Sequence, residues 1–414
     1  MGVRPVRGIR EFLREDIPEV ADLWQKVFLQ RKATPSESLQ TYLRSYFEEV
    51  FFRNPWYDES LPSFVFEDDS QKIVGFLGVI PRRMTLKGRP VRVAVSTQLM
   101  VDAGRRPGFA AFELLRRFFS GPQDLTLCDG ANESSQRIWR RAGGEVALLY
   151  SLLWVRVLRP TRFAMGLLAR GRRLLAPLAW TSGPICCALD GLAARMPLSP
   201  FRLSVPVSGE EEIAEETLLW CLSQLSGRQG LRPEYERDSV RWLLGQAGEM
   251  KRHGALRKVV VRDADGEVIG WYIYYSKPSG VSQVLQLGAR EHAVSPVLDH
   301  LFYHARRLGA VAVMGQLEPR FVRELSDSHC VLTCRGLGVL IHSRDRELLD
   351  TIHRGDAFLT RLEGEWWLRF GEIAAEPLQA VGTGLRGGRG RGGDPPLVSP
   401  PALETPLPRQ VHPL

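Results

Sequence analysis

The stretch that decides the fold reads Arg105-Arg106-Pro107-Gly108-Phe109-Ala110, and an apolar run ending in Leu99, Met100 and Val101 precedes it. We expect a strand over residues 91–101, a basic turn, and a helix over residues 109–119. The first N–H groups of such a helix have no intrahelical partner, and its dipole favours negative charge. Two arginines add donors suited to phosphate. The segment therefore predicts an anion site, and its plainer interpretation is a basic turn before a surface helix.

The elements around this turn alternate between strand and helix. Periodicity, caps and turn residues predict the order β-α-α-β-β-β-α-β-α-β. The predicted strands are residues 6–12, 63–67, 73–80, 91–101, 124–128 and 148–157. The predicted helices are one capped by Asp16 and those at residues 36–52, 109–119 and 132–142.

The second half of the chain repeats much of this order. Helices are expected near residues 211–225, 235–246 and 295–308, and strands near 255–262, 268–275, 281–287, 310–315 and 331–342. The strand over 281–287 is not followed by a basic glycine turn. We therefore expect a second, degenerate copy of the first fold.

The spacing Arg-x-x-Gly-x-Ala, together with this order of elements, resembles the GNAT superfamily of N-acetyltransferases. The resemblance implies an α+β, three-layer fold with a mixed, mostly antiparallel sheet flanked by helices, in two tandem copies. It also implies that the turn binds the diphosphate of acetyl-CoA or another acyl-CoA. The expected cofactor-binding residues are Leu99, Met100, Val101, Arg105, Arg106, Gly108, Phe109, Ala110 and Asn132.

The segment from Asn132 to Gly143 resembles the second motif of the superfamily. Asn132 would begin the helix or contact the pantetheine arm, although an ordinary N-cap explains it equally. Members of the superfamily usually have a tyrosine seven residues after this Asn, and that tyrosine can protonate the departing thiolate. In this sequence the position holds Trp139. An indole N–H donates a hydrogen bond but supplies no proton. Pro107 also removes a backbone N–H that many members use.

No general base is evident from the sequence. Asn132, Asp102 and Glu133 are the catalytic candidates, and Asp129 is a further acidic neighbour. Each of the three carboxylates could equally be structural or solvated. Many amine acetylations need only water to carry the proton away, so the absence of a clear base does not exclude catalysis.

The expected domain organisation has four parts. Residues 1–158 form an acyl-CoA-binding GNAT domain, 159–209 a helical linker, 210–376 the degenerate copy and 377–414 a Gly/Pro-rich disordered tail. In the linker, residues 162–180 predict a basic amphipathic helix. We expect it to pack between domains rather than lie on a membrane.

Composition sets broad limits. The chain has 414 residues, a formal net charge of +8 and six cysteines without disulfide or zinc spacing. We expect no secretory signal, no spanning segment, a cytoplasmic location, no metal and no nucleic-acid partner. His300 and His304 lie one helical turn apart, but without an acidic partner they indicate a surface helix.

The predicted function is transfer of an acyl group from an acyl-CoA to a primary amine of a small molecule or peptide. Two alternatives remain. A CoA-binding scaffold without turnover is favoured by Trp139, and a Fem-like aminoacyl or cell-envelope transferase would also pair two such folds. The turn in the first copy favours CoA over a charged tRNA.

Overall fold

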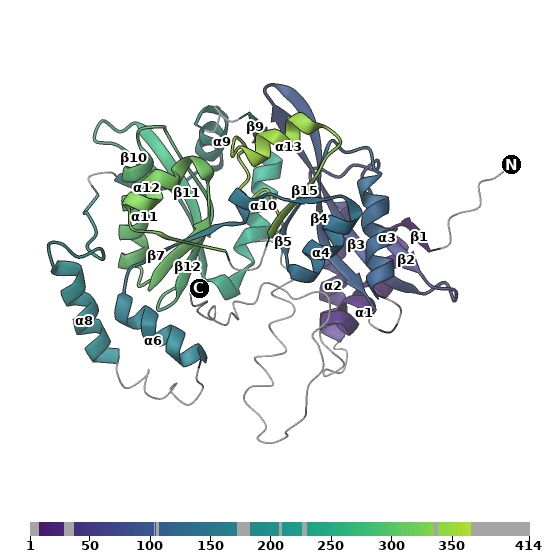
Figure 1. Cartoon of the computed structure of the whole chain (residues 1–414), viewed down its shortest axis with the longest axis horizontal. Coiled ribbons are helices and arrows are strands. Elements are labelled where there is room, and N and C mark those ends of the chain that lie inside the picture. Colours follow the sequence, from purple (N-terminus) through teal and green to yellow (C-terminus); the bar gives the residue numbers. More distant parts are fainter. Residues whose placement is uncertain are drawn as a thin grey trace, which may run out of the picture.

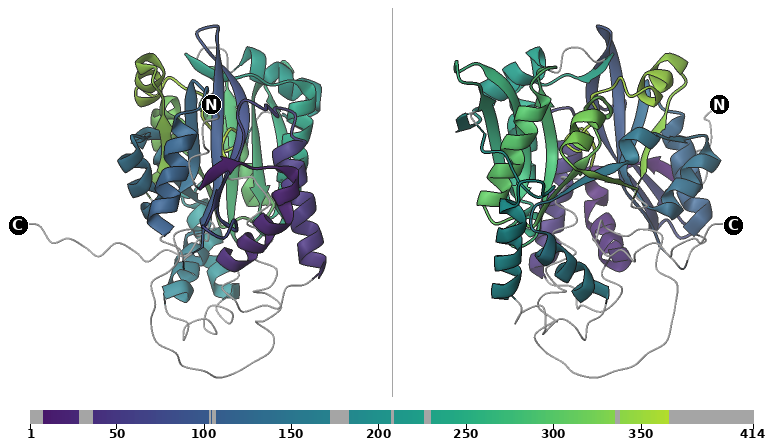
Figure 2. Two further views of the ribbon diagram at one scale, coloured as in Figure 1. Left: turned by 90° about the vertical axis from the view of Figure 1, so that its right-hand side faces the viewer. Right: turned by 60° about the vertical axis from the view of Figure 1, so that its left-hand side comes forward.

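The computed structural model describes residues 8–28, 37–102, 104, 107–171, 183–206, 209–225, 230–334 and 338–365. Two twisted sheets lie side by side in it (Figure 1). Helices flank both sheets, as the two further views also show (Figure 2). The predicted α+β architecture with two related copies is confirmed.

The first sheet has the strand order β1-β2-β3-β4-β5-β15-β6, with β9 added beside β3. Its strands up to β5 are antiparallel except for the parallel pair β4 and β5. The strands are β1 (Ile9–Glu11), β2 (Phe64–Glu67), β3 (Ile73–Leu86), β4 (Arg89–Val101), β5 (Leu125–Ala131), β6 (Glu145–Val146), β9 (Leu231–Pro233) and β15 (Gly338–His342).

Helices cover both faces of this sheet. On one face lie α1 (Ile17–Phe28) and α2 (Glu37–Phe52), whose apolar sides join the largest core cluster. On the other lie α3 (Pro107–Phe119) and α4 (Glu133–Ala142), which pack over a separate cluster around Leu114 and Trp139. Burial of these apolar faces stabilises the three layers.

The second sheet has the order β14-β7-β13-β12-β11-β10-β8. Its strands are β7 (Leu153–Val157), β8 (Gly209–Glu212), β10 (Ala255–Arg262), β11 (Val268–Ser276), β12 (Val281–Ala289), β13 (Ala312–Gln316) and β14 (Val331–Thr333). The helices that accompany it are α9 (Glu215–Gln224), α10 (Arg237–Gly248), α11 (Val294–Arg307) and α12 (Val322–Asp327). As in the first sheet, its central parallel pair, β12 and β13, is followed by a helix.

The two halves exchange a strand. We expected residues 148–157 to close the first sheet, but they form α5 (Leu148–Ser151) followed by β7, which pairs with β13 in the second sheet. The expected strand over 331–342 is likewise divided into β14 and β15. Of these, β15 pairs with β5 in the first sheet. Residues 1–158 therefore do not complete the first sheet, because its strand beside β5 comes from the far end of the chain.

A continuous core joins the halves. One cluster of buried side chains includes Phe76 and Val95 of the first sheet together with Trp271 and Ile273 of the second. Each of these four is fully buried. Since no polar layer separates the sheets at this cluster, we expect the halves to unfold together.

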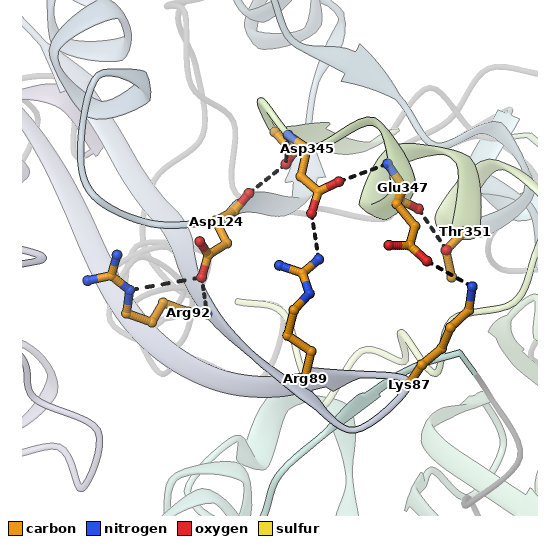
Figure 3. Close-up of polar contacts among 8 residues, drawn as sticks. Lys87, Arg89, Arg92, Asp124, Asp345, Glu347 and Thr351 are labelled. Carbon is orange, nitrogen blue, oxygen red and sulfur yellow. Dashed lines mark hydrogen bonds and ion pairs between the residues drawn. The ribbon is translucent and has the colours of Figure 1, made fainter.

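Ion pairs fasten the returning segment to the β3–β4 hairpin (Figure 3). Arg89 contacts Asp345 at 2.5 Å and Lys87 contacts Glu347 at 2.8 Å, both at the start of α13 (Arg346–His353). Ser343 donates to the carbonyl oxygen of Asp124 at 2.6 Å, just before β5. Because water screens such exposed pairs, they orient α13 more than they stabilise it.

The linker is helical where it is described. It holds α6 (Pro160–Gly171) and α8 (Gly183–Arg195), joined by a buried Asp190 that accepts hydrogen bonds from Thr161. Residues 172–180 of the predicted amphipathic helix and the tail from 377 onward lie outside the described residues. Within the part of the chain that the structure covers, no helix is both long and apolar enough to cross a membrane.

Because β15 comes from the second half of the chain and pairs in the first sheet, a destabilising substitution in β15 should destabilise both halves. Ile341 is fully buried between Leu127 and Glu145. The substitution Ile341→Ala should lower the free energy of unfolding by about 2–5 kcal/mol. Val331→Ala on exposed β14 should change it by about 0.5 kcal/mol or less. Thermal unfolding followed by near-UV circular dichroism should show a single transition, and its midpoint temperature should fall in Ile341→Ala but not in Val331→Ala. Two transitions, only one of which has a lower midpoint in Ile341→Ala, would contradict the shared core.

Candidate functional site

The parallel strands β4 and β5 separate before either of them ends. They pair at Val93–Leu125, Ala94–Thr126 and Val95–Leu127 only. β4 then continues to Val101 while β5 continues to Ala131 and pairs with β15 instead. The edge of β4 after Val95 is therefore not paired with β5, and we call this space the first strand gap.

A bulge in β4 helps to open the gap. The register between β3 and β4 shifts between Phe76 and Gly78, and Gln98 takes a left-handed φ of 51°. The side chain of Gln98 donates to the hydroxyl of Tyr46 at 2.7 Å, which holds the bulge against α2. A Cβ on Gly78 would lie 2.6 Å from the ring of Phe51, so only glycine fits opposite the bulge.

The predicted pantetheine-binding residues lie on this strand. Leu99, Met100 and Val101 are the last residues of β4, and Met100 is fully buried in the core. Backbone pairing on the β3 side uses Met100 with Phe76 and Val101 with Gly75. Their role in binding pantetheine stays a prediction.

The predicted diphosphate turn is described only in part. Arg105 and Arg106 lie outside the described residues. Gly108 and Phe109 are exposed in the first turn of α3, and Ala110 is buried beneath them. A Cβ built on Gly108 meets no atom within 4 Å among the described residues. Among the described residues nothing covers the first turn of α3 at Gly108, and the binding of a diphosphate at this turn stays a prediction.

The second predicted motif is built as the sequence indicates. Asn132 caps α4 by accepting a hydrogen bond from the N–H of Ser135 at 2.9 Å, and Gly143 ends the helix with a φ of 102°. Trp139 is 2% exposed and packs edge-to-face on Phe119 of α3. It is a core residue between the two helices.

The acidic candidates have structural contacts. Asp102 forms an ion pair with Lys26 of α1 and accepts a hydrogen bond from the N–H of Gly104 at 3.1 Å. Glu133 is exposed in the first turn of α4, where a negative charge suits the helix dipole.

A carboxylate that the sequence did not single out occupies the inner part of the first strand gap. Glu365 lies beside Thr97 and the backbone of Gln98 on β4. It also accepts from the thiol of Cys128 on β5 at 3.3 Å. Its own N–H donates to Asp129 at 2.7 Å. Glu365 therefore spans both edges of the gap at its closed end.

Burial and charge hold this group close to neutrality. Burial, and then the nearby Asp129 carboxylate, raise the pKa of Glu365 to about 8. The hydrogen bond from the Cys128 thiol acts in the opposite direction. A carboxyl with this pKa exchanges a proton at physiological pH, as a general base must.

The preceding residues position Glu365. Glu363 accepts from the N–H of Thr360 at 2.6 Å, from Gln286 of the second sheet at 3.1 Å and from the hydroxyl of Tyr235. Arg361 donates to Gln283 at 2.9 Å. Residues 357–365, here called the strap, thus run from the second sheet into the gap of the first. No motif in the sequence marks these residues.

The two histidines on α11 are not on a surface helix, contrary to expectation. His300 is 3% exposed, and the Nδ1 atoms of both His300 and His304 lie 2.9 Å from the hydroxyl of Tyr272. His300 is buried and His304 is half-buried because α11 packs this face onto β11. Among the described residues, no three His, Cys, Asp or Glu side chains gather in a way that could hold a metal ion.

Residues 8–121 match the family model described as acetyltransferase (GNAT) domain. Two solved structures share the fold, each with a TM-score of 0.51. One is an Enterococcus faecalis protein described as a probable N-acyltransferase, at 10% identity over 83% of this chain and 73% of that chain. The other is a GCN5-related N-acetyltransferase from Anabaena variabilis, at 11% identity over 81% and 72%. The curated proteins contain no match.

Gly108 offers a test of the diphosphate turn. Because a side chain there meets open space, Gly108→Asp should fold normally while placing a negative charge beside the expected diphosphate. CoA affinity should fall about tenfold or more. Gly108→Asn adds a side chain of the same shape as Asp but without the charge, so its CoA affinity should fall much less. Calorimetric titration with CoA measures both, and equal affinities for the two variants would argue against a diphosphate at this turn.

Proposed function

We propose that this chain, whose residues 8–121 match the acetyltransferase (GNAT) domain model, transfers an acyl group from an acyl-CoA to a primary amine, with Glu365 as the general base. The observation that carries the proposal is the position of Glu365. It lies at the closed end of the first strand gap, between Thr97 and Cys128. The pantetheine arm would enter along Val101, Met100 and Leu99 and bring the thioester toward this end.

The gap also offers what the thioester needs. After Val95, β4 no longer pairs with β5, so its backbone N–H groups on that side are the donors that we propose for the thioester. Such preorganised donors polarise the thioester carbonyl and stabilise the oxyanion that forms on it. Positioning in the gap and this polarisation supply most of the proposed rate.

The proposed reaction is direct attack. The amine nitrogen forms a C–N bond to the thioester carbon, Glu365 takes the proton that the nitrogen loses, and the C–S bond breaks. The thiolate leaves and is protonated by water, because Trp139 is buried in the core and has no acid to offer. One amide and one free thiol result.

The alternatives make different demands. A CoA-binding scaffold needs no titrating carboxylate in the gap, so the raised pKa of Glu365 favours an enzyme. A Fem-like transferase that used charged tRNA would not need the open turn at Gly108. Acetyl-CoA, which has a small acyl group, is the first donor to assay, against small amines and peptides.

Replacing Glu365 tests the base. Glu365→Gln should lower kcat about 100-fold or more while the KM for acetyl-CoA changes little. Glu133→Gln should leave both unchanged, since Glu133 is exposed. Free-thiol release with a panel of amines measures this. A full loss in Glu133→Gln, or full activity in Glu365→Gln, would identify a different base, and CoA binding with no thiol release would favour the scaffold.

The pH dependence offers an independent test. Glu365 accepts a proton only when ionised, so kcat/KM should increase with pH up to about 8 and then level off. Below pH 8, kcat/KM should be about tenfold lower for each pH unit. The Asp129 charge raises the pKa of Glu365, so in Asp129→Asn the increase of kcat/KM with pH should occur at lower pH. An unchanged pH profile in Asp129→Asn would contradict the assignment of Glu365 as the general base.

A further inference from the structure

We propose that helix α8 docks this protein onto the surface of an anionic lipid membrane. The contact is made by apolar side chains on α8 and on the residue that follows it, which are Ile185, Leu189, Leu192 and Met196. These four residues are here called the α8 stripe. They belong to the linker, so the inference goes beyond the proposed acyl transfer and does not rest on it.

The α8 stripe projects from one side of the helix. Its residues are spaced by four, three and four positions, which returns each side chain to the same face. Met196 continues the helical path, because its N–H donates to the carbonyl oxygen of Leu192 at 3.2 Å. The exposed fractions are 65% for Ile185, 48% for Leu189, 59% for Leu192 and 54% for Met196. The described chain therefore leaves this apolar face open.

The polarity of α8 is the reverse of that of a helix that faces water. Its one acidic residue, Asp190, is 3% exposed and accepts hydrogen bonds from the N–H and the hydroxyl of Thr161 on α6. Cys186, one turn earlier, is buried on the same side. The surface helices of soluble proteins turn their apolar side inward and their charges outward. The opposite arrangement indicates that an apolar medium covers the α8 stripe.

The position of α8 leaves the stripe accessible to a flat surface. The described part of the predicted helix over residues 162–180 lies in α6, which packs against the second sheet through Phe163. α8 packs in turn on α6 through Thr161 and Asp190. Both helices lie at the margin of the molecule, beyond the second sheet (Figures 1 and 2). Docking through α8 thus requires no movement of either sheet.

The charge of the linker indicates that this surface is anionic. Residues 159–206 contain seven arginines and one acidic residue, which is the buried Asp190. Arg195, in the last turn of α8, and Arg202 are both exposed. At the interface of an anionic bilayer, apolar side chains enter the boundary of the acyl chains while arginines meet the headgroups. The α8 stripe and its arginines supply both contacts.

A second copy of this chain fits the α8 stripe less well. A two-fold interface would place the same arginine-rich segment of both copies face to face. These like charges would repel each other, and residues 159–206 have no exposed acidic side chain that could offset the repulsion. An anionic bilayer offers opposite charge and an apolar interior together.

The test is flotation of the full chain with vesicles of phosphatidylcholine alone and with vesicles of phosphatidylcholine and phosphatidylserine in equal parts. The wild type should partition onto the acidic vesicles at least about tenfold more strongly, and added salt should weaken this binding. The double variant Ile185→Gln, Leu192→Gln keeps the charge but loses two apolar contacts, so its partitioning should fall about tenfold or more. The control variant Leu148→Gln, Val331→Gln changes two apolar residues outside α8, each 63% exposed, and should bind as the wild type does.

The proposal is overturned if the wild type does not partition onto the acidic vesicles, or if it partitions equally onto both kinds. Both measurements use the wild type alone, so they decide the matter even where a variant fails to fold. Full binding by the double variant in α8, with a near-UV circular dichroism spectrum like that of the wild type, would also overturn it. Sedimentation velocity without lipid tests the second copy. A dimer that the same variant converts to a monomer would assign the α8 stripe to self-association instead.

Discussion

The pairing of β15 with β5 is the constraint on which the rest of the structure depends. It places a strand from the end of the described chain beside β5, so β4 and β5 are free to separate after Val95. It also requires β7 to leave for the second sheet. The chain that follows β15 must return past both sheets through α13 and the strap. This return brings Glu365 to the closed end of the gap.

The same constraint joins the strand gaps of the two sheets, since β12 and β13, like β4 and β5, pair in parallel over only part of their length. The strap contributes Leu359 and Thr360 to the cavity of the second sheet and Glu365 to the gap of the first. Glu363, bound by Tyr235 and Gln286, holds it between them. Each gap contains a buried carboxylate with a raised pKa, Glu365 in the first and Glu318 in the second, because each excludes water at the point where two parallel strands separate.

The departures at the GNAT motifs have a physical explanation. Trp139 closes the core between α3 and α4 against Phe119, a packing role that a large apolar ring fills well. The acid that a tyrosine would supply is therefore absent from that position, and the proposed chemistry relies on Glu365 for the base and on water for the thiolate. Asp102 and Glu133 are committed to α1 and to the helix dipole, respectively.

The sequence by itself determined the local elements. Periodicity, caps and turn residues predicted α4 from its Asn132 cap to Gly143 and the hairpins of the first sheet, because these depend on neighbours in the chain. Only the tertiary structure decided which sheet receives β7 and β15, since an apolar strand carries no mark of its partner. The same holds for the environment of Glu365 and Glu318. Both are buried beside strands far away in the sequence, so spacing could not reveal them.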